Sequence, residues 1–174
     1  MIDVEVRAGA GAEAAPLVAR LVWACERLGI ERATMGLMLV EADEMADVNA
    51  RFRGTAQPTD VLAFPIDGPD VLAGWPADGP PPELGDVIIC AAAAEEPLTT
   101  LALHGLLHLL GYDHERSPAE ARRMFARERE LAAALRRAAG GGRSRRQPRK
   151  RARKGTGAAA PVPSRAKRRK DSER

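Results

Sequence analysis

Cysteine and histidine, two residue types that commonly bind zinc, are scarce in this 174-residue sequence. It contains two cysteines, Cys25 and Cys90, and three histidines. The cysteines lie far apart and neither belongs to a CxxC pair, so the sequence gives little support for a finger-type zinc site. Two separated cysteines also fit a reducing compartment.

Long apolar runs are absent as well. No stretch of about 18 apolar residues occurs, which argues against a membrane-spanning helix. The first residues, MIDVEVRAG, lack the basic and apolar regions of a signal peptide. We therefore expect a cytoplasmic protein with no membrane partner.

Charge is divided unevenly along the chain. Residues 140–174 hold fourteen Lys/Arg and two acids, a net charge of +12, whereas residues 1–139 hold thirteen Lys/Arg and twenty-two acids, a net charge of −9. The C-terminal segment also shows no hydrophobic period. We predict one folded domain over residues 1–139 and a disordered basic tail over residues 140–174.

All three histidines fall within eleven residues, HGLLHLLGYDH. On a helix, His104 and His108 stand four positions apart and project from one face, so they can share a metal ion. Gly111 tolerates the left-handed conformation that ends a helix and allows the chain to bring His114 back towards the same ion. Three imidazoles with one open position are typical of a catalytic zinc site. We predict one Zn²⁺ held by these three ligands.

The spacing also matches the zinc peptidase pattern HExxHxxGxxH, except that position 105 is glycine instead of glutamate. In those peptidases the glutamate is the general base, so its absence argues against a metalloprotease. We expect Gly105 to leave open space beside the metal, where a bulky substrate such as a phosphodiester could enter.

The histidine motif resembles the signature of the YbeY family of bacterial endoribonucleases and rRNA maturation factors. Two upstream segments are also similar to family motifs, NARFRGTAQPTDVLAFP over residues 49–65 and LGDVII over residues 84–89. Together the resemblance spans most of residues 1–139. Between Ile89 and His104 the chain departs from the family pattern, because only fourteen residues intervene where the family commonly has a longer helical segment.

This resemblance implies a zinc-dependent, single-strand-specific endoribonuclease that matures the 3′ end of 16S rRNA and takes part in late-stage 70S ribosome quality control. Its expected partners are rRNA precursors or other single-stranded RNA and the ribosome or its small subunit. The resemblance implies catalytic roles for Arg53 and His114, with Arg53 near the metal, where it binds phosphate or stabilises charge on the transferring group; the other interpretation is a solvated surface arginine. Thr59 and Asp60 are expected to face the substrate.

The basic tail then has two interpretations, a solvated solubility segment or a segment that holds the acidic domain on RNA by releasing counterions; the nuclease hypothesis favours the second. A non-catalytic ribosome-assembly factor with a structural zinc is the main alternative to the enzyme. For the ligand histidines, Asp113 and Glu115 are both local candidates for carboxylate support, and the sequence does not choose between them.

We predict an α+β fold, a small mixed β-sheet packed with helices and a three-histidine zinc site at the end of a central helix. The expected strands cover residues 2–6, 33–40, 61–64 and 84–90. Helices are expected over residues 14–28 and 41–53, from Thr99 or Thr100 through the histidines, and after a capping box at residues 117–120. In the second helix, Met45, Val48 and Phe52 are expected to face inward, and Cys25 is expected in the core.

Overall fold

The computed structural model describes residues 1–7, 12–68, 72 and 74–141. Its four strands are β1 (Ile2–Arg7), β2 (Ala33–Val40), β3 (Val61–Pro65) and β4 (Glu83–Cys90), and its helices are α1 (Ala14–Arg27), α2 (Ala42–Arg53), α4 (Leu98–Leu109) and α5 (Pro118–Gly141). The expected strands and helices are therefore confirmed to within two residues at almost every boundary. Most of the predicted basic tail lies outside the described residues.

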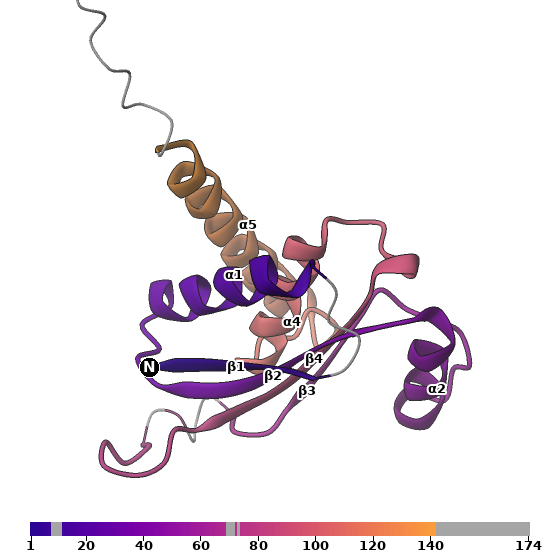
Figure 1. Cartoon of the computed structure of the whole chain (residues 1–174), viewed down its shortest axis with the longest axis horizontal. Coiled ribbons are helices and arrows are strands. Elements are labelled where there is room, and N and C mark those ends of the chain that lie inside the picture. Colours follow the sequence, from indigo (N-terminus) through magenta and orange to yellow (C-terminus); the bar gives the residue numbers. More distant parts are fainter. Residues whose placement is uncertain (8–11, 69–71, 73, 142–174) are drawn as a thin grey trace, which may run out of the picture. The chain divides into compact units, whose positions relative to one another are not determined.

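The sheet has the order β1-β2-β4-β3 (Figure 1). β1, β2 and β4 run parallel, and β3 pairs with β4 in the antiparallel direction. The predicted mixed sheet is thus confirmed. At the antiparallel pair, a Cβ on Gly85 would lie 2.0 Å from the carbonyl oxygen of Phe64, and Gly85 has φ +118°, so this strand position requires glycine.

Alternate residues of the strands serve two separate cores, because successive side chains point to opposite faces of a sheet. The larger core lies between the sheet and helices α1, α4 and α5, and includes Leu37, Val87 and Ile89. The smaller core lies under α2 and includes Met45, Leu62 and Ile88. The short connection from β4 to α4 contains only a 3₁₀ turn, Ala91–Ala93, and α4 itself packs on β3 and β4.

The prediction that Phe52 faces inward is wrong. Met45 is fully buried, but Phe52 is 67% exposed although it lies on the same side of α2. The helix sits at the end of the sheet (Figure 1), so its last turn has little sheet to cover it. The Phe52 ring contacts only Phe64 among the described aromatic rings, with centroids 4.7 Å apart.

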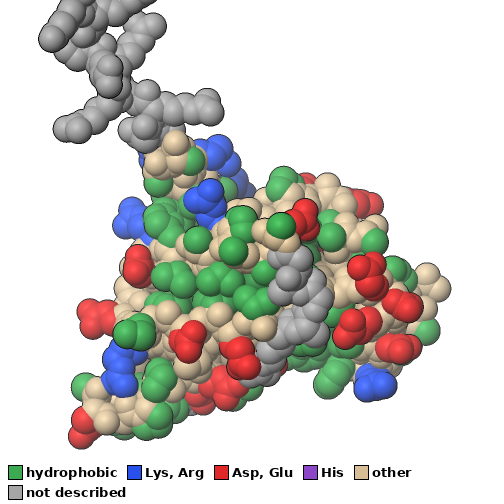
Figure 2. Space-filling view, viewed as in Figure 1, with side chains coloured by type: hydrophobic (Ala, Val, Ile, Leu, Met, Phe, Trp, Pro, Cys, Tyr) green, Lys and Arg blue, Asp and Glu red, His purple; other side chains and the backbone are tan. Residues whose placement is uncertain are grey.

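Charges on the folded domain are also segregated. In Figure 2, Lys and Arg side chains are densest along α5, and acidic side chains are spread over the rest of that face.

Helix α5 begins as predicted, since the Ser117 hydroxyl accepts a hydrogen bond from the Glu120 backbone N–H at 3.2 Å. Within the part of the chain that the structure describes, no helix combines the length and apolarity that a bilayer crossing requires.

Candidate metal centre

The end of α4 brings the third histidine back towards the first two. Gly111, two residues after the helix, has φ 80°. Its N–H donates to the carbonyl of His108 at 2.9 Å. The Tyr112 N–H donates to the carbonyl of Leu107 at 3.0 Å, which completes a Schellman motif. The predicted helix break at Gly111 is therefore confirmed, and the chain leaves it in the direction of His114.

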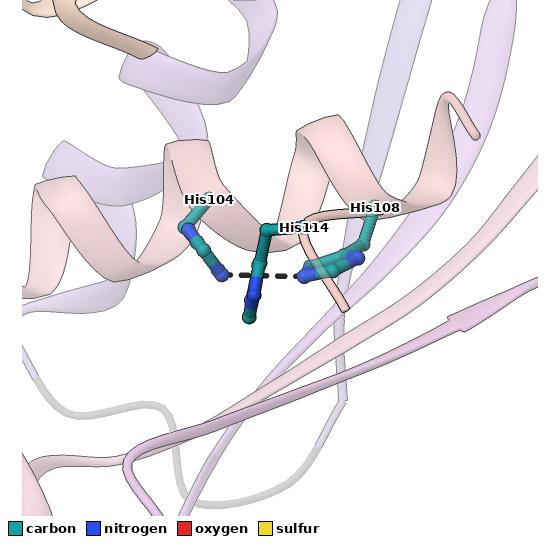
Figure 3. A group of neighbouring side chains, drawn as sticks. All are labelled: His104, His108 and His114. Atoms are coloured by element: carbon teal, nitrogen blue, oxygen red, sulfur yellow. Dashed lines mark hydrogen bonds between the residues drawn. The ribbon is translucent and has the colours of Figure 1, made fainter. Parts of the chain in front are cut away.

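The three imidazoles converge on one point below α4 (Figure 3). The Nε2 atoms of His104 and His108 lie 3.2 Å apart, and one nitrogen from each of the three rings lies within 4.8 Å of the others. Two nitrogens bound tetrahedrally to one zinc ion at 2.0–2.1 Å would be separated by about 3.3 Å. The spacing of His104 and His108 therefore fits a shared ion.

A carboxylate from α5 supports this ligand set. Nδ1 of His104 lies 3.2 Å from Oε2 of Glu128, and both side chains are only 18% exposed. A proton on Nδ1 satisfies this contact and leaves the Nε2 lone pair free for a metal, the arrangement that metal-binding histidines usually show. At His104 this support comes from Glu128 and from neither local candidate: Glu115 pairs with Arg53, and Asp113 accepts a hydrogen bond from the Glu115 N–H.

Burial also favours the metal-binding form of His108. It lowers the pKa of His108, and repulsion from His104 and His114 lowers this pKa further. The neutral imidazole, which is the form that binds metal, is therefore favoured at this position. His114 is held from its other side, where its ring stacks on Phe125 of α5 with centroids 5.5 Å apart.

The ligands open onto a pocket of about 210 Å³. Its walls include Arg53 from the end of α2, Glu115 from the turn after α4, and Thr59 and Asp60 from the loop before β3. Nη1 of Arg53 lies 3.5 Å from Oε1 of Glu115, and both side chains are more than half exposed. Arg53 thus lines the pocket that contains the histidines, although it lies more than fifty residues before His108 in sequence.

The loop before β3 is fixed to α2 by a residue that the sequence analysis did not single out. Asn49 is 6% exposed, and its side-chain amide donates to the carbonyl of Gln57 at 2.8 Å. This contact holds the segment that leads to Thr59 and Asp60. The Asp60 carboxylate in turn accepts hydrogen bonds from the Val61 N–H and the Thr59 hydroxyl.

The expectation of open space at position 105 is wrong. Gly105 is buried on the side of α4 that faces the sheet, and a Cβ there would lie 2.6 Å from Cγ1 of Val87. The missing side chain allows α4 to approach β4 closely; it does not enlarge the metal pocket. A glutamate at this position would meet the core instead of the metal, which strengthens the argument against the peptidase mechanism.

The matches to known proteins agree with this geometry. Residues 13–136 match the model of the family described as "Endoribonuclease YbeY". Proteins with that name from Salinispora tropica and Chloroflexus aurantiacus are 36% and 41% identical to the chain; the alignments cover 78% and 75% of this chain and 96% and 92% of the relatives. The solution structure of TM1509 from Thermotoga maritima is 26% identical, with a TM-score of 0.51 over 86% of this chain and all of that one.

Fold and site together define a small α+β protein with a three-histidine candidate metal centre that opens onto a pocket. The matches to the family model and to these relatives extend over most of the described domain. The chain belongs to the YbeY family.

Proposed function

We propose that this protein is a zinc-dependent endoribonuclease specific for single-stranded RNA. The observation that carries this proposal is the pocket itself, in which three metal-competent imidazoles and the guanidinium of Arg53 line one cavity. A metal and an arginine on one cavity suit a phosphodiester, whose transition state gains negative charge. The names of the relatives, which describe endoribonucleases, support the same assignment.

In this proposal each group has a distinct task. His104, His108 and His114 would hold Zn²⁺, which would supply Lewis acidity for phosphodiester cleavage. Glu128 fixes the ring of His104, and Phe125 fixes that of His114. Arg53 binds the phosphate and gives up its exposed ion pair with Glu115 to do so. The phosphate can replace Glu115 because an exposed ion pair contributes little free energy.

Membership of the YbeY family supports a cellular role in rRNA processing. We infer that the substrate is precursor rRNA in the cytoplasm, that cleavage matures the 3′ end of 16S rRNA, and that the protein acts with the small subunit and in late-stage 70S quality control. We further infer that residues 140–174 form a separate basic tail that increases affinity for RNA. Its +12 charge complements the −9 charge of the domain and favours attraction to a polyanion.

The test is cleavage of single-stranded RNA by purified protein of measured zinc content. We compare the parent with His108→Ala, Arg53→Ala and Arg51→Ala, each checked for folding. Arg51 is the matched control because it lies in the same last turn of α2 but does not line the pocket. We expect His108→Ala to lose zinc and activity, and Arg53→Ala to keep zinc and lose at least about 100-fold in rate, as expected when a group that stabilises transition-state charge is removed. Equal cleavage by all four would identify a contaminating nuclease.

A second candidate is a ribosome-assembly factor with a structural zinc. It is favoured by the position of His114 in the turn that joins α4 to α5, where a metal would link this turn to the helix. Chelation distinguishes the two. A protein that stays folded without zinc but stops cutting RNA is the enzyme, whereas one that unfolds on zinc removal and never cuts RNA is the assembly factor.

A further inference from the structure

A second pocket adjoins the metal pocket and is also lined by His104. Its volume is about 330 Å³, and it shares His104 and Asp60 with the first pocket. Most of its remaining polar and aromatic lining is Glu96 from the segment before α4, Thr100 from the first turn of α4, and Phe125 and Glu128 from α5. A substrate in the metal pocket therefore has an adjacent cavity to occupy.

Phe125 gives this second pocket an exposed aromatic surface. The residue is 41% exposed, whereas the core residue before it, Met124, is fully buried. Because Phe125 also stacks on His114, its position is fixed relative to the metal ligands. A rigid, exposed ring beside a catalytic centre is the kind of surface on which single-stranded nucleic acids stack their bases.

The charges of the two pockets differ. The metal pocket holds the guanidinium of Arg53 beside the carboxylates of Asp60 and Glu115, and a Zn²⁺ ion on its three histidines would make it attract phosphate. The second pocket contains the carboxylates of Asp60, Glu96 and Glu128 and no Lys or Arg among its lining residues, so it repels phosphate. Carboxylates accept hydrogen bonds from the amino groups of bases, as in the pairing of Glu or Asp with N4 of cytosine.

From this arrangement we propose that the pocket between α4 and α5 is a nucleobase subsite, in which a base stacks on Phe125 and presents an amino group to the carboxylates, Glu96 in particular. This proposal deepens the proposed endoribonuclease function and rests on it. Cytosine and uracil separate the two contributions. They are similar in size and stack alike, but cytosine carries an amino donor at the position where uracil carries a carbonyl acceptor.

The experiment measures the affinities of zinc-loaded, full-length protein for fluorescent oligo(C) and oligo(U) of equal length, with cleavage-resistant linkages. The ratio of the two affinities is the readout, because phosphate contacts and the basic tail contribute equally to both oligonucleotides. The variants are Phe125→Leu, Phe125→Trp and Glu96→Gln, with Phe52→Leu as a matched control on another exposed phenylalanine. Zinc content is measured for each protein.

We expect the parent to bind oligo(C) about tenfold more tightly than oligo(U). Phe125→Leu should weaken both by about tenfold, the size expected for one lost stacking contact, and Phe125→Trp should retain the parent affinities. Glu96→Gln should bring the ratio close to one, because an amide can donate to the uracil carbonyl. Phe52→Leu should behave as the parent.

Two results would overturn the subsite: equal affinity of the parent for the two oligonucleotides, or equal affinities of Phe125→Leu and Phe52→Leu. Cleavage of unmodified RNA by the same preparations separates this failure from failure of the proposed function. A parent that cuts RNA but does not distinguish the bases is a nuclease without this subsite. A parent that distinguishes the bases but does not cut RNA has the subsite without the nuclease activity.

Discussion

The close approach of Gly105 to Val87 predicts that Gly105→Ala destabilises the protein, whereas helix propensity alone predicts that it stabilises it. In the middle of an exposed helix, Gly→Ala stabilises by about 0.5–1 kcal/mol. At position 105, however, the new Cβ would lie 2.6 Å and 3.0 Å from the two methyl carbons of Val87. Val87 is fully buried and branched at Cβ, so its methyl groups cannot rotate away freely.

Overpacking of this kind in a core costs about 1–3 kcal/mol. After the helix-propensity gain is subtracted, we expect Gly105→Ala to lower the free energy of unfolding by about 1 kcal/mol, and by about 2.5 kcal/mol at most. Urea denaturation measures this change directly, and a fall in Tm of several degrees should accompany it. The measurement is made on protein of known zinc content, because bound metal also stabilises the folded state.

A double-mutant cycle tests the cause. Val87→Ala removes the two methyl groups that the new Cβ would meet, so Gly105→Ala should be neutral or stabilising in that background. A coupling free energy of at least about 1 kcal/mol is expected for two residues in direct contact. Stabilisation of the parent protein by Gly105→Ala, or additivity of the two substitutions, would refute a steric conflict between position 105 and Val87.

Three further predictions concern the metal, the tail and a buried thiol. Glu128→Gln should weaken zinc affinity by about 10- to 100-fold in a competition titration with a chelator, since it alters the partner of His104, whereas Glu130→Gln on the exposed side of α5 should not. Deletion of residues 140–174 should weaken RNA binding and flatten its salt dependence at unchanged zinc content; an unchanged salt slope would contradict a role in RNA binding. Burial raises the pKa of Cys25 to about 12, so little thiolate forms at pH 8; alkylation followed by mass spectrometry should find it unmodified in the folded protein and modified in urea.

Most of the secondary structure was predictable, because local patterns determine it. The apolar run Ala33–Val40 became β2 with those bounds, and the helical spacing from Ala14 onwards became α1. Phe52 shows the limit of such patterns. Its spacing from Met45 identifies the correct side of α2, but the spacing does not show that the sheet ends before the last turn of the helix.

The candidate site was predictable in its ligands but not in the residues around them. A signal for Glu128 was present in the sequence, since it falls at the spacing of Met124 and Leu131, which are buried on the inner face of α5. An acid on an apolar helix face indicates a buried partner, but it does not identify that partner. The contact with His104 exists only because α5 packs against α4.

The sequence by itself determined the features that depend on neighbours along the chain: the four-residue spacing of His104 and His108, the glycine turn before His114, and the cap that starts α5. Only the tertiary structure decided which distant groups meet them. Packing of α5 on α4 brings Glu128 and Phe125 to the histidines, and the end of α2 brings Arg53 to the same pocket. Local sequence specifies backbone conformation through hydrogen bonding and steric limits, whereas contacts between separate elements depend on how the whole core packs.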